Sequence, residues 1–336
     1  MARRRLSEQQ KNRIARIQQA RRQRAEASAE QALNDSEKHL QTFAGRVVVR
    51  HGRNLLLRGD DGRNIHAMFR ANLGEVVCGD RVLWQPTADD EGVVTALLPR
   101  SSALSRPDFN GQDKAIAANI TQLVVVLAVR PEPAGYLLDQ YLVAAERIGV
   151  NGLICLNKVD LLNQQEREAF EKRYEIYQRI GYPVIGISAK TEHGLDPLLD
   201  KLRDQTSILV GQSGVGKSSL INTLIPRENV LEGELSDSTG LGRHTTSAAT
   251  LYTLASGGEL IDSPGVRSFR LGQVSRAELE QGYPEFADYL GQCRFHNCAH
   301  LAEPGCAIRA AAERGEIEQS RLASYRHLLA EAMSSS

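Results

Sequence analysis

The segment GQSGVGKSS, residues 211–219, constrains the fold of this chain more than any other feature of its sequence. Its spacing fits the pattern G-x-x-x-x-G-K-[ST], the apolar run SILV precedes it, and the helical pattern SLINTLI continues it. The glycines let backbone amides wrap around phosphate groups, and the N-terminus of the following helix adds positive potential. We therefore predict a strand, a phosphate-binding loop and a helix in succession.

Two side chains of this loop have predicted roles with a phosphate and its metal ion. Lys217 is expected to reach the terminal phosphates, and the hydroxyl of Ser218 can ligate Mg²⁺. The complete set of predicted phosphate-loop residues is Gly211, Gln212, Ser213, Gly214, Val215, Gly216, Lys217, Ser218 and Ser219.

The chain before the loop alternates between strand-like and helix-like patterns. The predicted strands are 122–129, 151–157, 183–188 and 207–210, and the predicted helices are 136–149, 165–180 and one that begins near Leu195. This alternation predicts a parallel sheet with helices on both faces. Ligands of such sheets bind at the carboxyl ends of the strands.

The segment NKVD, at the end of one predicted strand, indicates the base of the nucleotide. The carboxylate of Asp160 can accept hydrogen bonds from N1 and the 2-amino group of guanine, whereas adenine has no matching pair of donors. Asn157 is expected to brace the loop, and the stem of Lys158 to lie across the base. The segment SAK, at the end of another strand, supplies a second loop. The predicted base-side residues are Asn157, Lys158, Val159, Asp160, Ser188, Ala189 and Lys190.

Two later segments complete the predicted site. In IDSPG, the carboxylate of Asp262 can hold a water bound to Mg²⁺, and the amide of Gly265 can meet the γ-phosphate. In GRHTT, either Thr245 or Thr246 can supply the hydroxyl that completes the magnesium shell, and the sequence alone does not choose between them.

The order of these segments is rearranged. NKVD and SAK precede the phosphate loop, and GRHTT and DSPG follow it. Because a parallel sheet brings all these loops to one edge, the same site can form from a different order of connections. We therefore predict a circularly permuted α/β P-loop GTPase domain.

Cysteine and histidine residues cluster in the segment CRFHNCAHLAEPGC. Cys293, Cys298, His300 and Cys306 supply three thiolates and one imidazole, enough to close a tetrahedral zinc site without an open position for a substrate. Such a site is structural. A pairing that uses His296 instead stays open as the competing ligand assignment.

Short apolar runs near the N-terminus predict a small barrel. The runs GRVVVR, NLLLR, NIHAMF, DRVLWQP and GVVTALLP fit a five-stranded barrel of the oligonucleotide-binding (OB) type. Arginines in its first half predict a basic face, namely Arg46, Arg50, Arg53, Arg58, Arg63 and Arg70. A structural barrel with solvated arginines is the alternative. The segment SRPDFNGQDK that follows is expected to be a linker.

Basic residues are concentrated at the N-terminus, although the formal net charge of the chain is zero. Residues 1–24 contain eight Arg and one Lys against one Glu. Side chains at this density release counterions when they meet phosphates, so we expect this flexible tail to contact nucleic acid. Because no secretory signal or membrane span is recognisable, a cytoplasmic location without membrane association is expected.

Together these features resemble the ribosome small subunit-dependent GTPase A family, RsgA, also called YjeQ. The features are the Arg-rich tail, the barrel, the motifs NKVD, SAK, GQSGVGKSS, GRHTT and DSPG, and the C-x4-C-x-H-x5-C cluster. The resemblance implies a bacterial cytoplasmic, largely monomeric protein that binds GTP and GDP, uses magnesium with GTP, and contacts the 30S ribosomal subunit and its 16S rRNA late in maturation. It also implies hydrolysis stimulated by that subunit, and one structural zinc ion on Cys293, Cys298, His300 and Cys306.

The predicted organisation has four parts. They are a basic flexible tail (1–40), an OB-type RNA-binding barrel (41–104), the permuted GTPase domain (105–272), and a mostly helical zinc-binding domain with a C-terminal helix (273–336).

One position bears on the rate of hydrolysis. Val266 follows the DSPG glycine, where many GTPases have a glutamine that orients the attacking water, and valine cannot form hydrogen bonds with its side chain. Slow intrinsic hydrolysis is therefore expected. We hypothesise that His244 positions or polarises the water once the ribosome orders its loop, the alternative being a solvated loop histidine.

Other classes of protein make different predictions. A P-loop kinase or ATPase would require NKVD and SAK to be coincidental, and a nucleic-acid-binding module with a decayed GTPase centre would bind nucleotide without turnover. A GTP-regulated factor for another RNA stays open, because the tail and barrel do not identify the RNA.

Overall fold

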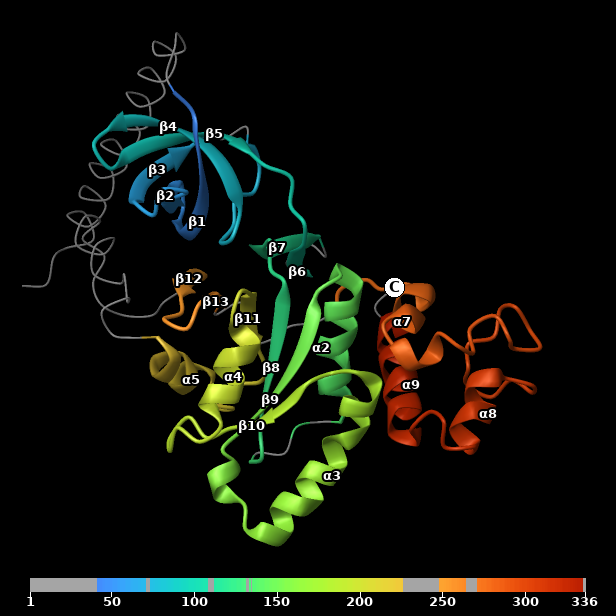
Figure 1. Cartoon of the computed structure of the whole chain (residues 1–336). Coiled ribbons are helices and arrows are strands. Elements are labelled where there is room, and N and C mark those ends of the chain that lie inside the picture. The colour runs from blue at the N-terminus through green and yellow to red at the C-terminus, as the bar shows by residue number, and fades with distance from the viewer. Residues whose placement is uncertain are drawn as a thin grey trace, which may run out of the picture.

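The computed structural model describes residues 41–70, 73–107, 112–130, 133, 135–225, 248–263 and 271–334. The predicted tail, residues 1–40, lies outside the described residues. The described chain forms a barrel, a central sheet with helices on both faces, and a C-terminal group of helices (Figure 1). This architecture confirms the fold class predicted from the sequence.

Five strands close into a barrel. They are β1 (Phe43–His51), β2 (Asn54–Gly59), β3 (Asn64–Phe69), β4 (Arg81–Ala88) and β5 (Glu91–Leu97). Their hydrogen-bonded order is β1-β2-β3-β5-β4, and an additional β1–β4 pairing completes the circle. Inward-facing side chains such as Val47, Leu57 and Val82 fill the interior.

Some of the barrel arginines turn toward the central sheet. Arg46 forms an ion pair with Glu259 and donates to the carbonyl oxygen of Asn119 at 3.0 Å. Arg58 donates to the hydroxyl of Thr253. Arg46 and Arg58, two of the six arginines predicted to form a basic face, therefore help to hold the barrel against the rest of the protein.

Both ends of the segment expected to be a linker after the barrel, residues 105–107 and 113–114, belong to an antiparallel ribbon. In this ribbon β6 (Ala103–Pro107) pairs with β7 (Asp113–Ala118). Leu104 and Ala117 are buried in the main hydrophobic core. The linker prediction is wrong because the polar composition of the segment concealed the apolar residues that flank it.

The central sheet is parallel apart from one edge strand. Its strands are β8 (Gln122–Ala128), β9 (Asn151–Asn157), β10 (Val184–Gly186), β11 (Thr206–Val210), β12 (Thr250–Thr253) and β13 (Glu259–Asp262). The order is β10-β9-β8-β11-β13-β12, and only the β12–β13 pair is antiparallel. The carboxyl ends of β9, β11 and β13 consequently lie at one edge.

Helices cover both faces of the central sheet. They are α2 (Gly135–Ile148), α3 (Gln164–Ile180), α4 (Leu195–Leu202) and α5 (Lys217–Leu224). Leu123 and Val125 of β8 share a core with α2 and α3, whereas Val124 and Val126 share a core with α4 and α5. Successive strand residues point to opposite faces, so β8 serves both layers.

One strand pair joins the barrel to the central sheet. β1 pairs with β12 at Val49 and Thr250, so the strands of both form one eleven-stranded sheet. The sequence did not reveal this junction, because the open edge of a strand has no signature in the order of residues.

The C-terminal part has its own core and packs against α2. Its helices are α7 (Arg276–Gln281), α8 (Ala307–Glu313) and α9 (Gln319–Ser334), with the short 3-10 helix Pro284–Phe286 between the first two. Leu279, Phe286 and Tyr325 are fully buried in this core. None of the helices in the described ranges has both the length and the apolar character needed to cross a bilayer.

Helix α2 contacts the C-terminal part through residues four apart, which lie on one face of a helix. Asp139 forms an ion pair with Arg321 of α9. Val143 belongs to the C-terminal core, and Arg147 donates to Glu278 of α7 at 3.0 Å. The opposite face of α2 packs on the central sheet, so α2 lies between the two parts.

Candidate functional site

The loop of residues 211–216 connects β11 to α5 and needs glycine at two positions. Gly211 and Gly216 have positive φ angles of 141° and 95°, which residues with a Cβ rarely adopt. A Cβ would lie 2.2 Å from the carbonyl oxygen of Val126 at the first position and 2.4 Å from Nδ2 of Asn157 at the second. The loop can therefore pass directly beside the ends of β8 and β9.

The side-chain amide of Asn157 connects three loops. Its Nδ2 donates to the carbonyl oxygen of Val215 at 2.9 Å. Its Oδ1 accepts from the backbone nitrogens of Lys158, at 2.8 Å, and Ala189, at 3.2 Å. Asn157 is only 2% exposed. The segments NKVD, SAK and 211–219 thus meet at one buried side chain.

The remaining residues of NKVD lie around this junction. Lys158 has a left-handed backbone with a φ of 65°, and its Nζ donates to the carbonyl oxygen of Gly214 at 2.7 Å. Val159 is buried at the start of the 3-10 helix Val159–Leu161, and Asp160 in the same turn is exposed. The stem of Lys158 therefore lies between the base-side loop and the phosphate loop.

The SAK segment follows β10. Ser188 is buried, and its Oγ accepts from the backbone nitrogen of Thr191 at 3.2 Å. Ala189 is half-buried beside Asn157, whereas Lys190 is exposed. The hydroxyl of Ser188 thus fixes the turn that brings the Ala189 amide to Asn157.

The phosphate-side residues lie at the same edge of the sheet. Lys217 is buried, and its Nζ donates to the carbonyl oxygens of Gly211 and Gln212 at 2.6 and 2.7 Å. Ser218 is exposed in the first turn of α5. Asp262 is half-buried at the end of β13. Because β13 pairs in parallel with β11, the C-terminal ends of the two strands lie at the same edge of the sheet. The predicted residues Gly265, His244, Thr245 and Thr246 lie outside the described residues.

One residue beside the loop was not found by sequence reasoning. The hydroxyl of Tyr141, on α2, hydrogen-bonds the backbone of Gly211, and burial raises the pKa of this hydroxyl to about 12. In the sequence, Tyr141 is indistinguishable from the other core residues of an amphipathic helix. Its contact with the phosphate loop depends on how α2 crosses the sheet.

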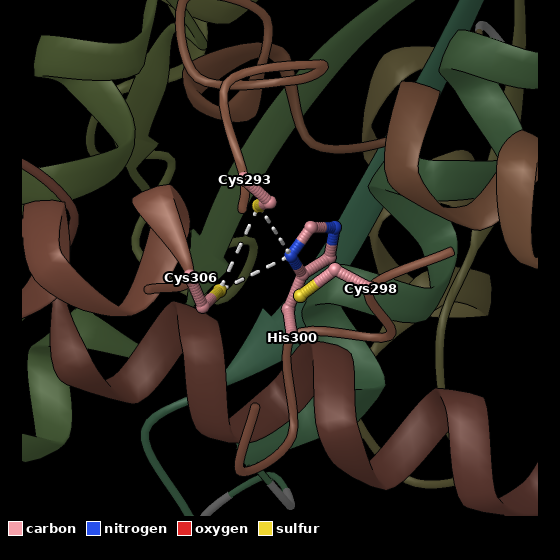
Figure 2. A group of neighbouring side chains, drawn as sticks. All are labelled: Cys293, Cys298, His300 and Cys306. Carbon is pink, nitrogen blue, oxygen red and sulfur yellow. Dashed lines mark hydrogen bonds between the residues drawn. The ribbon is translucent and has the colours of Figure 1, made fainter. Parts of the chain in front are cut away.

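Three cysteines and one histidine of the C-terminal part form a compact group (Figure 2). The ligand atoms of Cys293, Cys298, His300 and Cys306 all lie within 4.8 Å of one another. Nδ1 of His300 is 3.6 Å from Sγ of Cys293 and 3.3 Å from Sγ of Cys306, and these two sulfurs are 4.0 Å apart. His296 is exposed and lies outside the group.

This group fits a tetrahedral metal ion. Ligand atoms about 2.3 Å from one tetrahedral ion are roughly 3.8 Å from each other. The distances between the sulfurs and Nδ1, from 3.3 to 4.0 Å, are of that size. Burial raises the pKa of the Cys298 thiol to about 12, so this thiol needs a neighbouring cation to ionise near neutral pH.

The loop that carries these ligands is fixed by a carboxylate. Glu303 accepts hydrogen bonds from the backbone nitrogens of Ala299, Leu301 and Ala302, at 2.8, 2.9 and 3.1 Å. These hydrogen bonds, led by that of Ala299, lower the pKa of Glu303 to about 2. The backbone on both sides of His300 is thus ordered by one side chain.

The fold and the site together define a class of protein. A glycine-rich loop lies between a strand and a helix of a parallel sheet, and Asn157 joins it to two loops that come earlier in the chain. The protein is a P-loop GTPase with circularly permuted connections, and near its C-terminus it carries three cysteines and one histidine that could hold a metal ion.

The family model described as RsgA GTPase matches residues 97–272. The chain belongs to the RsgA GTPase family, and it is a GTP hydrolase. The small ribosomal subunit biogenesis GTPase RsgA of Ectopseudomonas mendocina (strain ymp) is 46% identical over 337 residues, which cover 98% of each chain. The protein of the same name from Hahella chejuensis (strain KCTC 2396) is 46% identical over 332 residues, covering 97% of this chain and 95% of that one.

Solved structures show the same architecture. YjeQ from Thermotoga maritima matches with a TM-score of 0.73 and 31% identity, over 87% of this chain and 99% of that chain. YloQ, described as a circularly permuted GTPase, matches with a TM-score of 0.70 and 28% identity, over 89% and 98%. The family resemblance drawn from the sequence motifs is confirmed.

Proposed function

We propose that this protein binds the small ribosomal subunit late in its maturation and hydrolyses GTP there to GDP and phosphate. The observation that carries the proposal is the buried amide of Asn157, which joins the base-side loops to the phosphate loop. The names of the relatives, small ribosomal subunit biogenesis GTPases, support the choice of subunit. On this proposal 16S rRNA is the polyanion that the basic tail meets, and the protein works as a cytoplasmic monomer.

In the proposed site, each loop recognises one part of the nucleotide. Asp160 accepts hydrogen bonds from guanine, and the stem of Lys158 covers the base. The amides of residues 211–219 surround the phosphates, and Lys217 turns from the loop carbonyls toward the terminal phosphates. Ser218, Asp262 and a threonine, Thr245 or Thr246, surround Mg²⁺. Bound there, Mg²⁺ would supply positive charge against the charge that develops on the phosphates during transfer.

We further propose that the cysteine and histidine group holds one zinc ion with a structural role. Its four ligands leave no position for a substrate, and the donor set is of the kind that selects zinc. In this proposal Cys293, Cys298, His300 and Cys306 tie the loop before α8 to the C-terminal core, which contacts α2.

Sedimentation with purified ribosomal subunits tests the proposed partner. We expect the protein to pellet with the small subunit in the presence of a non-hydrolysable GTP analogue, and to do so much less with GDP. It should stay in the supernatant with the large subunit. Equal binding to both subunits, or none to either, would favour a factor that acts on another RNA.

Single-turnover hydrolysis tests the proposed part of His244. Because Val266 cannot orient water, we expect slow hydrolysis without the subunit and acceleration with it. His244→Ala should lose about a hundredfold or more of that acceleration, as is typical for a group that acts on the transferred proton. His327→Ala, a change at an exposed histidine of α9, is the control. Unchanged stimulation in His244→Ala would remove His244 from the mechanism.

A further inference from the structure

The two ring nitrogens of His300 face different partners. Nδ1 points toward the cysteine sulfurs, and the other ring nitrogen points away from them (Figure 2). That second nitrogen, Nε2, lies 3.4 Å from Oε1 of Glu280 on α7. His300 is only 3% exposed, so water does not compete freely for either nitrogen.

Nδ1 can ligate a metal only when the ring proton is on Nε2. A carboxylate that accepts this proton in a hydrogen bond fixes the tautomer, sets the plane of the ring and makes Nδ1 a better donor to the metal. Glu280 is the carboxylate found at that nitrogen.

Glu280 is itself held in place from two sides. Its Oε1 lies 3.2 Å from Nε of Arg276, one turn earlier on α7, and 3.4 Å from the hydroxyl of Tyr325 on α9. Tyr325 is fully buried, so the packing of its ring fixes the position of this hydroxyl. The carboxylate thus has a defined position before any metal binds.

The backbone of His300 is fixed independently of Glu280. His300 has a left-handed φ of 62°, and its carbonyl oxygen accepts from Nε and Nη2 of Arg326, each at 3.2 Å. These contacts fix the backbone from which the side chain extends. The orientation of the imidazole ring then depends on the groups at its two nitrogens.

We infer that Glu280 is a positioning residue for the metal ligand His300, holding the imidazole in the tautomer and orientation that present Nδ1 to the ion. The inference rests on the zinc site proposed above. Glu280 contacts the ligand His300 rather than the metal. Its removal should therefore lower the affinity for the metal while all four ligands stay in place.

Zinc release from the purified full-length protein tests this inference. Zinc content is measured first, and release to a colorimetric chelator is then followed for the wild type, Glu280→Gln and Glu280→Ala. Loss of such a partner typically costs about 10- to 100-fold in metal affinity. We expect Glu280→Ala to release zinc up to about a hundredfold faster, and Glu280→Gln, which keeps a carbonyl acceptor, about tenfold faster. Glu313→Gln, at an exposed glutamate that ends α8, is the matched control and should release zinc like the wild type.

A spectroscopic measurement separates positioning from general stability. In the cobalt-substituted protein, the visible ligand-field bands should shift in Glu280→Ala and stay unchanged in Glu313→Gln. Wild-type release rates in both Glu280 variants would overturn the inference. If Glu280→Ala does not fold, the zinc release rate and the cobalt ligand-field bands of Glu280→Gln test the inference instead. Wild-type protein without bound zinc would instead contradict the zinc assignment, so the two failures are distinguishable.

Discussion

At the scale of single residues, the identity of Asn157 follows from its hydrogen bonds. Its side chain donates to the carbonyl oxygen of Val215 and accepts from the amides of Lys158 and Ala189. Aspartate has the same shape but no donor, so it would set a carboxylate oxygen against the carbonyl of Val215. Only an amide satisfies all three partners at this buried position.

We expect Asn157→Asp to weaken GDP binding by about tenfold or more, since an unsatisfied buried contact costs about 1–3 kcal/mol and disturbs the phosphate loop. Calorimetric titration with GDP measures the change. Asn151→Asp, at an exposed residue that begins β9, is the control and should bind as the wild type does. Affinity within twofold of the wild type in Asn157→Asp would contradict the joining role of this amide.

At the scale of elements, α7 depends on its first turn. The hydroxyl of Ser275 accepts from the backbone nitrogen of Glu278, and the Glu278 carboxylate accepts in return from the backbone nitrogen of Ser275, which forms a capping box. Hydrogen bonds from the Ser275 side chain and backbone, followed by the contact with Arg147, lower the pKa of Glu278 to about 2. The ionised form of Glu278 is therefore favoured in the folded protein.

This lowered pKa predicts a pH dependence with a defined sign. A carboxyl group with a depressed folded-state pKa stabilises the fold above its unfolded pKa, here 4.5, and loses that contribution as the pH falls toward the folded value. Glu278→Gln should therefore lower the denaturant midpoint at pH 7, and its difference from the wild type should shrink below about pH 4.5. Glu313→Gln, measured in parallel, should show no such trend. A difference that stays constant from pH 7 to pH 3 would rule out this contribution.

The elements that the sequence predicted correctly are those with a local signature. The buried run of β8, the amphipathic pattern of α2 and the glycine spacing of 211–216 each follow from neighbouring residues. The ribbon β6–β7 was missed because the polar composition of its segment concealed the flanking apolar residues. The β1–β12 junction was missed for another reason, since it depends on a partner far away in the chain. The same limit applies to the candidate site. Spacing identified its motif residues, whereas Tyr141 and Glu280 became visible only once the helices that carry them were packed.

At the scale of the whole molecule, a buried ion group joins the C-terminal helices to α2, which packs on the central sheet. Arg321 is fully buried and pairs with Asp139 of α2 and with Glu285, the latter at 2.6 Å. Its guanidinium also lies 4.4 Å from the ring centre of Tyr283. Burial raises the pKa of Asp139, and the charge of Arg321 opposes this effect. The group thus stabilises the packing of the C-terminal part against α2 only while the guanidinium is present.

We expect Arg321→Met to destabilise the protein by about 3–5 kcal/mol, because it leaves buried carboxylates without their cation. Denaturant unfolding measures this loss. The double change Arg321→Met with Asp139→Asn should recover part of it, since one of the stranded charges is then removed. A loss in Arg321→Met below about 1 kcal/mol would mean that the group does not hold the two parts together.

The central claim is that loops from separate parts of the chain meet at one edge of the sheet to bind a guanine nucleotide, and titration with different bases tests it most directly. The wild type should bind GDP at least about a hundredfold more tightly than ADP, because adenine cannot satisfy the carboxylate of Asp160. Asp160→Asn should lose GDP affinity and gain affinity for xanthosine diphosphate, whose 2-oxo group can accept from the new amide while N1–H donates to its oxygen. Equal affinity of the wild type for GDP and ADP, or an unchanged preference in Asp160→Asn, would contradict the account.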